Sequence, residues 1–269
     1  MEQALRKFFE SHEDNSPPTE NEYINNDDGL KYCKICNSPK QCKITFQDKE
    51  MIVACTCKCI DEVQNKIDQA KQLQRVNDLK RNITDTLYHK MTFEKSDTEI
   101  KFAKKYVENF EKYKKENIGL MLIGDKGTGK TYAAACIANA LCENLTSVYM
   151  ANVLYLTQQL GDFNAKNETL DKIRKCQLLI VDDIGAERQT DYMCEQVYNI
   201  IETRYRANKP LVITSNITLD QLKKCDDIRL VRTYDRLKEM CHPIVMSGNS
   251  RRIKKANDRF LRVKAELEG

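Results

Sequence analysis

Residues 124–131 read GDKGTGKT, and they constrain the fold of this chain more than any other segment. They fill every position that the phosphate-binding pattern G-x-x-x-x-G-K-[ST] specifies. An apolar run at residues 119–123 precedes them, and an alanine-rich run with helical character follows. Glycines permit the tight turn, and backbone amides and the helix N-terminus then converge on one point. The segment therefore predicts a strand, a loop and a helix that together bind phosphate.

Each residue of this loop is a candidate for nucleotide binding: Gly124, Asp125, Lys126, Gly127, Thr128, Gly129, Lys130 and Thr131. Lys130 is expected to meet the β- and γ-phosphates, and Thr131 to ligate Mg²⁺ through its hydroxyl. The alternative is a glycine-rich turn that matches by chance, and the flanking strand and helix patterns weigh against it.

A second apolar run, residues 178–181, leads directly into two acids, Asp182 and Asp183. In an open α/β sheet, ligands bind at the carboxyl ends of the strands, where both acids would lie. Asp182 is the candidate for holding Mg²⁺ through water, and Asp183 for polarising the attacking water. The alternative is that the acids cap a following helix. Asn216, after the next strand, is a candidate contact to the γ-phosphate or the water, although an asparagine there is also an ordinary turn residue.

Apolar runs alternate with helical patterns from about residue 90 onward. Strand-like runs occupy residues 119–123, 147–150, 178–182, 211–215 and 243–246, and helical patterns occupy residues 130–141, 154–160, 193–206 and 220–224. Strands that alternate with helices predict a mostly parallel sheet with helices on both faces. We therefore expect a three-layer α/β domain.

The part before this domain reads differently. Residues 1–30 begin with the pattern of a short amphipathic helix and continue into a polar stretch with two prolines, for which we expect flexibility. Residues 60–81 contain neither Gly nor Pro and are rich in Lys, Gln, Asp and Leu, which predicts one exposed helix.

Between these two stretches lie six of the twelve cysteines. Cys33-x-x-Cys36 is a knuckle that can present two thiolates to one tetrahedral ion, and Zn²⁺ is the expected occupant. The candidate ligands are four of the five residues Cys33, Cys36, Cys55, Cys57 and Cys59. Three cysteines compete for the second pair of places; Cys57 and Cys59 are favoured, Cys55 is the alternate and Cys42 is a further candidate. The alternative, free buried thiols, is disfavoured because so polar a region could hardly fold without a metal.

Charge and hydropathy narrow the class of protein. The formal net charge of +4, from 44 basic and 40 acidic residues, is too balanced to indicate nucleic acid by itself. Basic residues cluster in a tail: Arg251, Arg252, Lys254, Lys255, Arg259, Arg262 and Lys264. This tail could contact phosphates, although such a charge run is usually a solvated face. No apolar run approaches the roughly 18 residues of a membrane span, and the first residues lack a signal-peptide core. We expect no membrane contact and a location in the cytosol.

Four stretches resemble the AAA+ ATPases of the bacterial and phage DnaC type, the replicative-helicase loaders, and more distantly the IstB-type transposition ATPases. They are GDKGTGKT at residues 124–131, LLIVDDIGAE at 178–187, ITSN at 213–216 and RTYDRLKEMC at 232–241. The second and fourth are fairly specific to this group, whereas the first marks any P-loop protein. The resemblance covers residues 82–257.

The resemblance implies ATP as the nucleotide and roles for three more side chains. Asn216 is similar to the family's sensor 1 residue, and Arg236 to the arginine finger offered to a neighbouring subunit. Arg252 is similar to the sensor 2 arginine; Arg251 stands where the family has a tyrosine and is a possible substitute. A surface charge is the alternative for each arginine. A finger supplied in trans implies an ATP-dependent homo-oligomer.

The residue patterns divide the chain into domains, and the resemblance implies the partners. We expect a flexible segment at residues 1–30, a zinc-binding module with a linker helix at 31–82, and an AAA+ ATPase domain with a basic tail at 83–269. The implied function is ATP-dependent loading of a DnaB-type replicative helicase, bound through the cysteine-rich module, onto single-stranded DNA. The alternative is an IstB-type transposition helper that binds target DNA and a transposase. A third possibility, a binding module with a degenerate ATP site, conflicts with the intact Lys130, Thr131 and Asp182.

Overall fold

A computed structural model describes residues 14–46, 49–97, 99–185, 191–216, 228–248 and 250–268, with the backbone alone for residues 46, 191, 228–230, 251, 252, 254, 255 and 258. The chain divides into two compact units, Met1–Gln74 and Arg75–Gly269. The first contains the crowded cysteines and the second contains the phosphate-binding loop. The helices predicted near the N-terminus and at residues 220–224 lie outside the described residues.

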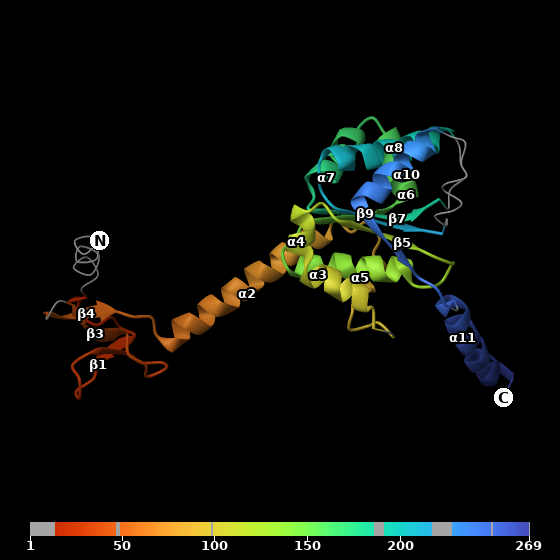
Figure 1. Cartoon of the computed structure of the whole chain (residues 1–269). Coiled ribbons are helices and arrows are strands. Elements are labelled where there is room, and N and C mark those ends of the chain that lie inside the picture. The colour runs from red at the N-terminus through yellow and green to blue at the C-terminus, as the bar shows by residue number, and fades with distance from the viewer. Residues whose placement is uncertain are drawn as a thin grey trace. The chain divides into compact units, whose positions relative to one another are not determined.

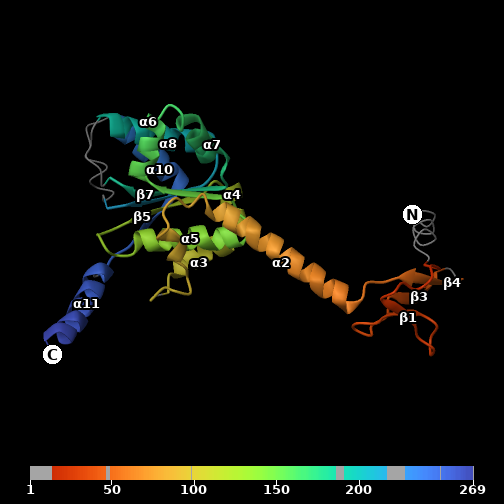
Figure 2. The ribbon, with the colours of Figure 1, turned by 180° about the vertical axis from the view of Figure 1, so that it is seen from behind.

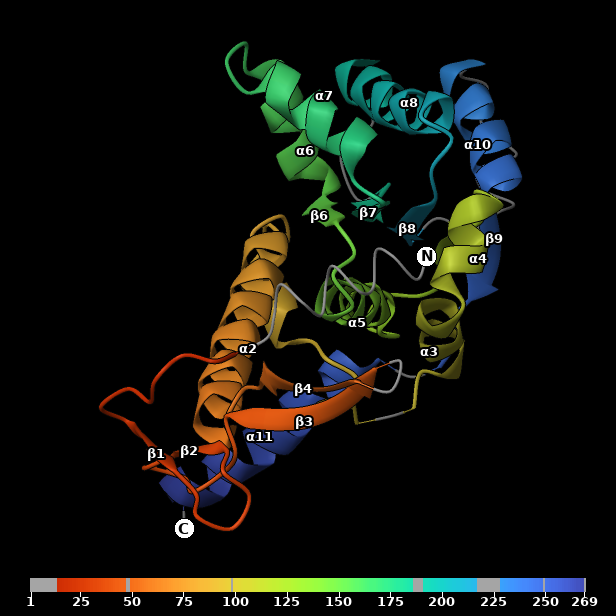
Figure 3. The ribbon, with the colours of Figure 1, turned by 90° about the vertical axis from the view of Figure 1, so that its left-hand side faces the viewer.

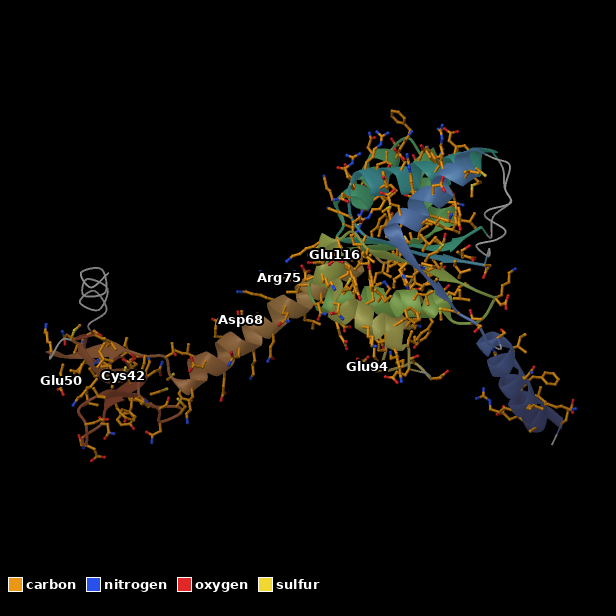
Figure 4. The ribbon with its side chains drawn as sticks, in the orientation of Figure 1. Cys42, Glu50, Asp68, Arg75, Glu94 and Glu116 are labelled. Carbon is orange, nitrogen blue, oxygen red and sulfur yellow. The ribbon has the colours of Figure 1, made fainter. Side chains whose placement is uncertain are left out.

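Two antiparallel strand pairs build the first unit. The strands are β1 (Glu22–Ile24) with β2 (Lys31–Cys33), and β3 (Gln41–Phe46) with β4 (Lys49–Ala54). Figure 4 marks the second pair by Cys42 on β3 and Glu50 on β4. The buried apolar side chains described here are few, namely Leu30, Cys33, Met51 and Cys57. A core this small rarely stabilises a fold without a covalent or metal staple.

Part of the stretch expected to be flexible is built into this unit. β1 pairs with β2, and the Asp14 carboxylate lies 2.9 Å from the buried ammonium of Lys31. Asp14 also accepts a hydrogen bond from Gln41. The polar composition of residues 14–30 therefore serves hydrogen bonds and turns, which composition alone cannot distinguish from a flexible segment.

Among the described residues, five parallel strands form one sheet in the second unit, in the order β6-β7-β8-β5-β9. They are β5 (Gly119–Ile123), β6 (Val148–Asn152), β7 (Leu178–Ile184), β8 (Leu211–Ser215) and β9 (Cys241–Val245). The predicted strands agree with these within a few residues. β9 begins two residues earlier than predicted because Pro243 is tolerated inside an edge strand.

Helices cover both faces of this sheet (Figure 1, Figure 2 and Figure 3). One face carries α3 (Lys101–Glu108), α4 (Phe110–Lys115) and α5 (Lys130–Glu143), with the short helix η1 (Tyr88–Lys90). The other face carries α6 (Val153–Gly161), α7 (Lys166–Lys175), α8 (Asp191–Arg206) and α10 (Ile228–Met240). Each face has its own cluster of buried apolar residues. The prediction of a three-layer α/β domain is confirmed.

Two long helices are largely solvent-exposed over their described side chains. α2 (Lys58–Lys80) is the exposed helix predicted for residues 60–81, and its Asp68 and Arg75 side chains project into solvent (Figure 4). α11 (Arg251–Glu268) is formed by the basic tail. Over the described part of the chain, no helix combines the length and apolar character that crossing a membrane requires.

Candidate nucleotide-binding site and cysteine cluster

A cavity of about 520 Å³ lies where the phosphate-binding loop meets the carboxyl ends of β7 and β8. Its volume falls within the range of small-molecule sites, and its place in the sheet is where ligands of open α/β folds bind. The predicted residues that line it are Lys126, Gly127, Gly129, Lys130, Thr131, Asp182, Asp183 and Asn216. The sheet thus brings together side chains from three separate motifs.

The loop backbone takes conformations that favour glycine. Gly124, Gly127 and Gly129 have φ angles of 149°, 85° and 99°. A Cβ atom at Gly124 would also collide with the carbonyl group of Met246, at the end of the neighbouring strand β9. The Thr128 hydroxyl donates to the carbonyl of Asp125 at 2.9 Å and closes the turn. The loop is therefore held in one shape before α5 begins at Lys130.

Lys130 and Asp183 are joined through Asn216. The Lys130 Nζ donates to Oδ1 of Asn216 at 2.8 Å, and the Asn216 Nδ2 donates to Oδ1 of Asp183 at 2.9 Å. Lys130 is 7% exposed. Its ammonium also contacts the carbonyl oxygens of Gly124 and Asp125, so it is directed into the loop. One amide thus joins the ammonium of Lys130 to the carboxylate of Asp183.

Asp182 is buried among hydroxyl donors. Its Oδ1 accepts hydrogen bonds from Thr131 at 2.9 Å and Thr214 at 2.7 Å, and its Oδ2 accepts one from Tyr88 at 2.9 Å. Mg²⁺ prefers oxygen ligands. Thr131 and Asp182 supply a hydroxyl and a carboxylate in direct contact at the wall of the cavity, so these two residues fit a magnesium ion.

Asp183 has a left-handed backbone, with a φ angle of 62°. Its amide donates to the Thr214 hydroxyl at 2.8 Å, and the register between β7 and β8 shifts at this point. Aspartate and asparagine adopt this region more readily than other residues that carry a Cβ. The bulge lets two consecutive acids both border the cavity, whereas a regular strand would point them to opposite faces.

The cavity wall that comes from residues 85–97 was not predicted from the sequence. The lining residues there are Asp85, Leu87, Tyr88, Met91, Ser96 and Asp97. Burial raises the pKa of Tyr88 far above its ordinary value, and the neighbouring Asp182 carboxylate adds to this shift. The hydroxyl therefore remains a hydrogen-bond donor at neutral pH. The local sequence showed no sign of this position: Leu87, next to Tyr88, is exposed, and nothing in the run indicates a hydroxyl beside Asp182.

Of the predicted arginines, only Arg236 has a described side chain, and it lies away from the cavity. Arg236, on α10, pairs with Glu202 on α8, and its guanidinium lies 5.2 Å from the ring centroid of Tyr198 and 5.1 Å from that of Tyr205. Arg236 does not belong to the described residues that line the cavity, and 24% of its side chain is exposed. The side chains of Arg251 and Arg252 lie outside the described residues.

Four cysteines of the first unit form a cluster suited to a metal ion. The Sγ atoms of Cys33, Cys36, Cys57 and Cys59 all lie within 4.8 Å of one another. A hydrogen bond from Ser38 lowers the pKa of Cys36 to about 5, and the hydrogen bond with Cys36 raises the pKa of Cys59 to about 12. Thiols this close cannot all ionise together unless a cation balances them. The donor set fits a tetrahedral site with four sulfur ligands.

Local structure explains which cysteines meet. The Asn37 amide donates to the Cys33 carbonyl at 2.9 Å, which closes the knuckle. Cys57 accepts from the amides of Ile60 and Asp61 at the start of α2, so Cys59 lies in the first turn of that helix. Cys55 lies outside the cluster. Its amide bonds to the Lys40 carbonyl at 2.8 Å and extends the β3–β4 pairing. Burial raises the pKa of the Cys55 thiol above its ordinary value, and the nearby Cys42 thiol raises it further.

Comparison with known proteins places the second unit in a family. The model described as "IstB-like ATP binding protein" matches residues 59–259. The chain is 30% identical to the phage-like element PBSX protein XkdC of Bacillus subtilis, over 52% of this chain and 54% of XkdC. It therefore spans about half the length of XkdC. It is also similar to the replicative helicase loader DnaI of Bacillus subtilis, with 24% identity over 82% of this chain and 79% of DnaI.

The fold agrees with a solved structure. The crystal structure of DnaI superposes with a TM-score of 0.53 and 28% sequence identity, covering 62% of this chain and 94% of that chain. The likeness thus extends over nearly the whole solved DnaI chain.

Proposed function

Because this chain belongs to the family of IstB-like ATP binding proteins, we propose that it is an ATP-dependent loader that delivers a DnaB-type replicative helicase to single-stranded DNA. The observation that carries this proposal is the continuous hydrogen-bonded path from Lys130 through Asn216 to Asp183 at one cavity. The similarity to the helicase loader DnaI over 79% of its length supports the loading role. The family description by itself fits a transposition helper equally well. The similarity to DnaI, however, includes parts of both units of this chain.

The proposed roles of the residues follow from their contacts. Lys130 and the amides of the loop bind the β- and γ-phosphates of ATP. Asp183 orients the attacking water and accepts its proton, and Asn216 holds Asp183 at a fixed distance from Lys130. An aspartate reaches less far than a glutamate at this place, so the water must approach the strand closely.

Thr131 and Asp182 are the proposed holders of Mg²⁺. The ion supplies charge neutralisation for the phosphates when it is bound. Thr214 and Tyr88 each donate a hydrogen bond to Asp182 and hold that carboxylate in place at the wall of the cavity.

The proposed metal of the first unit is Zn²⁺, bound by Cys33, Cys36, Cys57 and Cys59. Such an ion would stabilise a unit that has few buried apolar residues. We propose that this unit binds the helicase, so the ATPase unit and the partner-binding unit are separate parts of the chain. The proposed functional domains are the cysteine-rich module with its linker helix at residues 31–82 and the ATPase domain at residues 83–269.

Arg236 is the proposed finger for the ATP site of a neighbouring copy. Its ion pair with Glu202 and its packing on two tyrosines hold the guanidinium in one direction, while part of the side chain stays exposed. A finger in trans makes the assembly of copies depend on ATP. Arg252 is the proposed second arginine near the γ-phosphate. The other basic residues of α11 are proposed to bind the phosphates of single-stranded DNA, and the proposed location is the cytoplasm.

Co-purification tests the loading role. The chain is mixed with a DnaB-type helicase, with and without Mg-ATP, and the complex is isolated by size exclusion before single-stranded DNA is added. A loader forms a defined complex that places the helicase on the DNA. Filaments on duplex DNA without helicase binding would favour the transposition helper instead, and absence of ATP turnover with and without DNA would favour a pure binding module.

A further inference from the structure

Among the hydrogen bonds described for Asp182, the one from Tyr88 comes from outside the sheet and the phosphate-binding loop. It lies in η1, is 6% exposed and borders the cavity. Its hydroxyl donates to Oδ2 of Asp182, while Thr131 and Thr214 both donate to Oδ1. Because a carboxylate has two oxygens, fixing its orientation requires a donor on each side. Tyr88 supplies the donor on the Oδ2 side.

The importance of this donor depends on Thr131. In the proposed function Thr131 and Asp182 both bind Mg²⁺. The hydrogen bond between them therefore does not restrain the carboxylate in every state of the site. Thr214 and Tyr88 have no such second role. They remain as the pair that keeps the plane of the Asp182 carboxylate fixed.

The segment that carries Tyr88 is itself anchored. The buried side chain of Asn139, on α5, donates to the carbonyl oxygens of Tyr88 at 2.8 Å and Met91 at 2.9 Å. Upstream, the Thr84 amide donates at 2.9 Å to the carbonyl of Met150, which lies in the edge strand β6. Residues 82–91 therefore run from the edge strand β6 to the carboxylate on the adjacent strand β7, with hydrogen-bonded anchors at both ends.

We propose that Tyr88 is a positioning residue for the magnesium site, and that it couples the conformation of residues 82–91 to the binding of Mg-ATP. This inference rests on the proposed function, since it concerns the same carboxylate. Linkage requires the coupling to be reciprocal: if the metal orders Asp182 and Tyr88, a shift of this segment changes the affinity for the metal. The segment follows α2 in the sequence. It therefore connects that helix to the rest of the ATPase unit.

Tyr88→Phe tests the positioning role, with Tyr106→Phe as the matched control. Tyr106 is also buried on the same face of the sheet, and its hydroxyl donates one hydrogen bond, to the Ile118 carbonyl at 2.9 Å. The affinity for a fluorescent ATP analogue is measured across a Mg²⁺ titration and in EDTA. For Tyr88→Phe we expect the half-saturating Mg²⁺ concentration to rise about ten-fold, as loss of a hydrogen bond to a charged group implies, with affinity in EDTA unchanged. Tyr106→Phe should match the wild type in both.

Hydrogen exchange over residues 82–91 gives a second readout. Mg-ATP should slow exchange there in the wild type and in Tyr106→Phe, but much less in Tyr88→Phe. An unchanged Mg²⁺ requirement in Tyr88→Phe, or an equal loss of affinity with and without Mg²⁺, would overturn the positioning role. A wild-type chain that binds no nucleotide would contradict the proposed function as well, so the two failures are distinguishable.

Discussion

Lys130 of the phosphate-binding loop donates a 2.8 Å hydrogen bond to Asn216, which lies 86 residues further along the chain. The two residues meet because β5, which leads into the loop, pairs in parallel with β8, which ends beside Asn216. The same amide group binds Asp183 through its other end. A change in any one of the three polar groups therefore alters the surroundings of the other two.

Asn216→Ala should separate catalysis from binding. The variant loses the link between Lys130 and Asp183, but Lys130 keeps its contacts to the loop and the loop keeps its shape. We expect ATP turnover to fall about a hundred-fold or more, with the nucleotide affinity changed by less than about ten-fold. Steady-state ATPase assays and nucleotide titration measure the two effects. Asn109→Ala, which removes an exposed bond to the Lys105 carbonyl, is the control and should leave both values unchanged.

Asp183 tests the link between backbone conformation and chemistry. Asp183→Asn keeps a side chain that tolerates a φ of 62° and should remain folded while losing most of the hydrolysis. Asp183→Ala should in addition lower the free energy of unfolding by about 1 kcal/mol, because alanine is strained in the left-handed region. Urea unfolding and ATPase assays compare the two variants. Equal hydrolysis in Asp183→Asn and the wild type would exclude Asp183 as the base.

Arg236 and Arg206 both contact Glu202, but only Arg236 is a candidate finger. Arg236→Lys keeps a positive charge beside Glu202 and should leave ATP binding nearly intact while lowering hydrolysis or ATP-dependent assembly. Arg206→Ala removes the more exposed partner of the same glutamate and should change neither. Sedimentation and ATPase assays as a function of protein concentration make the comparison. Identical behaviour of the two variants would contradict the assignment of a finger in trans.

The cysteine cluster predicts a metal content that differs between neighbouring variants. Cys59→Ser removes one of the four clustered thiols and should reduce bound zinc well below about one equivalent. Cys55→Ser changes a thiol outside the cluster and should retain the full zinc content. Elemental analysis of the purified chains measures both. Loss of zinc in Cys55→Ser alone would mean that the favoured set of ligands is wrong.

The sequence predicted best the features whose residues are adjacent in the chain. The phosphate-binding loop, the strand that ends in Asp182 and Asp183, and the buried strands of the sheet were all read from continuous runs. Tyr88 was missed because its partner, Asp182, lies 94 residues away and nothing in the local pattern identifies a hydroxyl aimed at it. The choice among Cys55, Cys57 and Cys59 was left open for a related reason. It depends on where the β3–β4 pairing ends and where α2 begins, and spacing does not show this.

The burial of a charged side chain was also not predictable from the sequence. Arg204 is fully buried, and it donates to the main-chain carbonyls of Ile173, Cys176, Gln177 and Pro210. In sequence it is one of several basic residues at the end of a helix and gives no sign of burial. An arginine is tolerated in the interior when each donor meets an acceptor, and such a match of five donors to carbonyls appears only in three dimensions.

Asp14 predicts a pH dependence for the stability of the first unit. Hydrogen bonds from Ser16 and from Lys31 hold the pKa of the Asp14 carboxyl well below its ordinary value of 3.8. A carboxyl whose pKa is lowered by folding stabilises the fold above its unfolded pKa, and this contribution is lost as the pH falls toward the folded pKa. Asp14→Asn should therefore cost about 2 kcal/mol at pH 7, since it leaves the buried Lys31 ammonium without its anion, and progressively less below about pH 4. Hydrogen exchange at the β3 and β4 amides of the full chain, corrected for intrinsic rates, measures the difference between variant and wild type at each pH. Protonation of the cysteines at low pH affects both chains equally and cancels in this difference. A gap that stays constant between pH 7 and pH 3 would mean that Asp14 stabilises the unit through its shape and not through its charge.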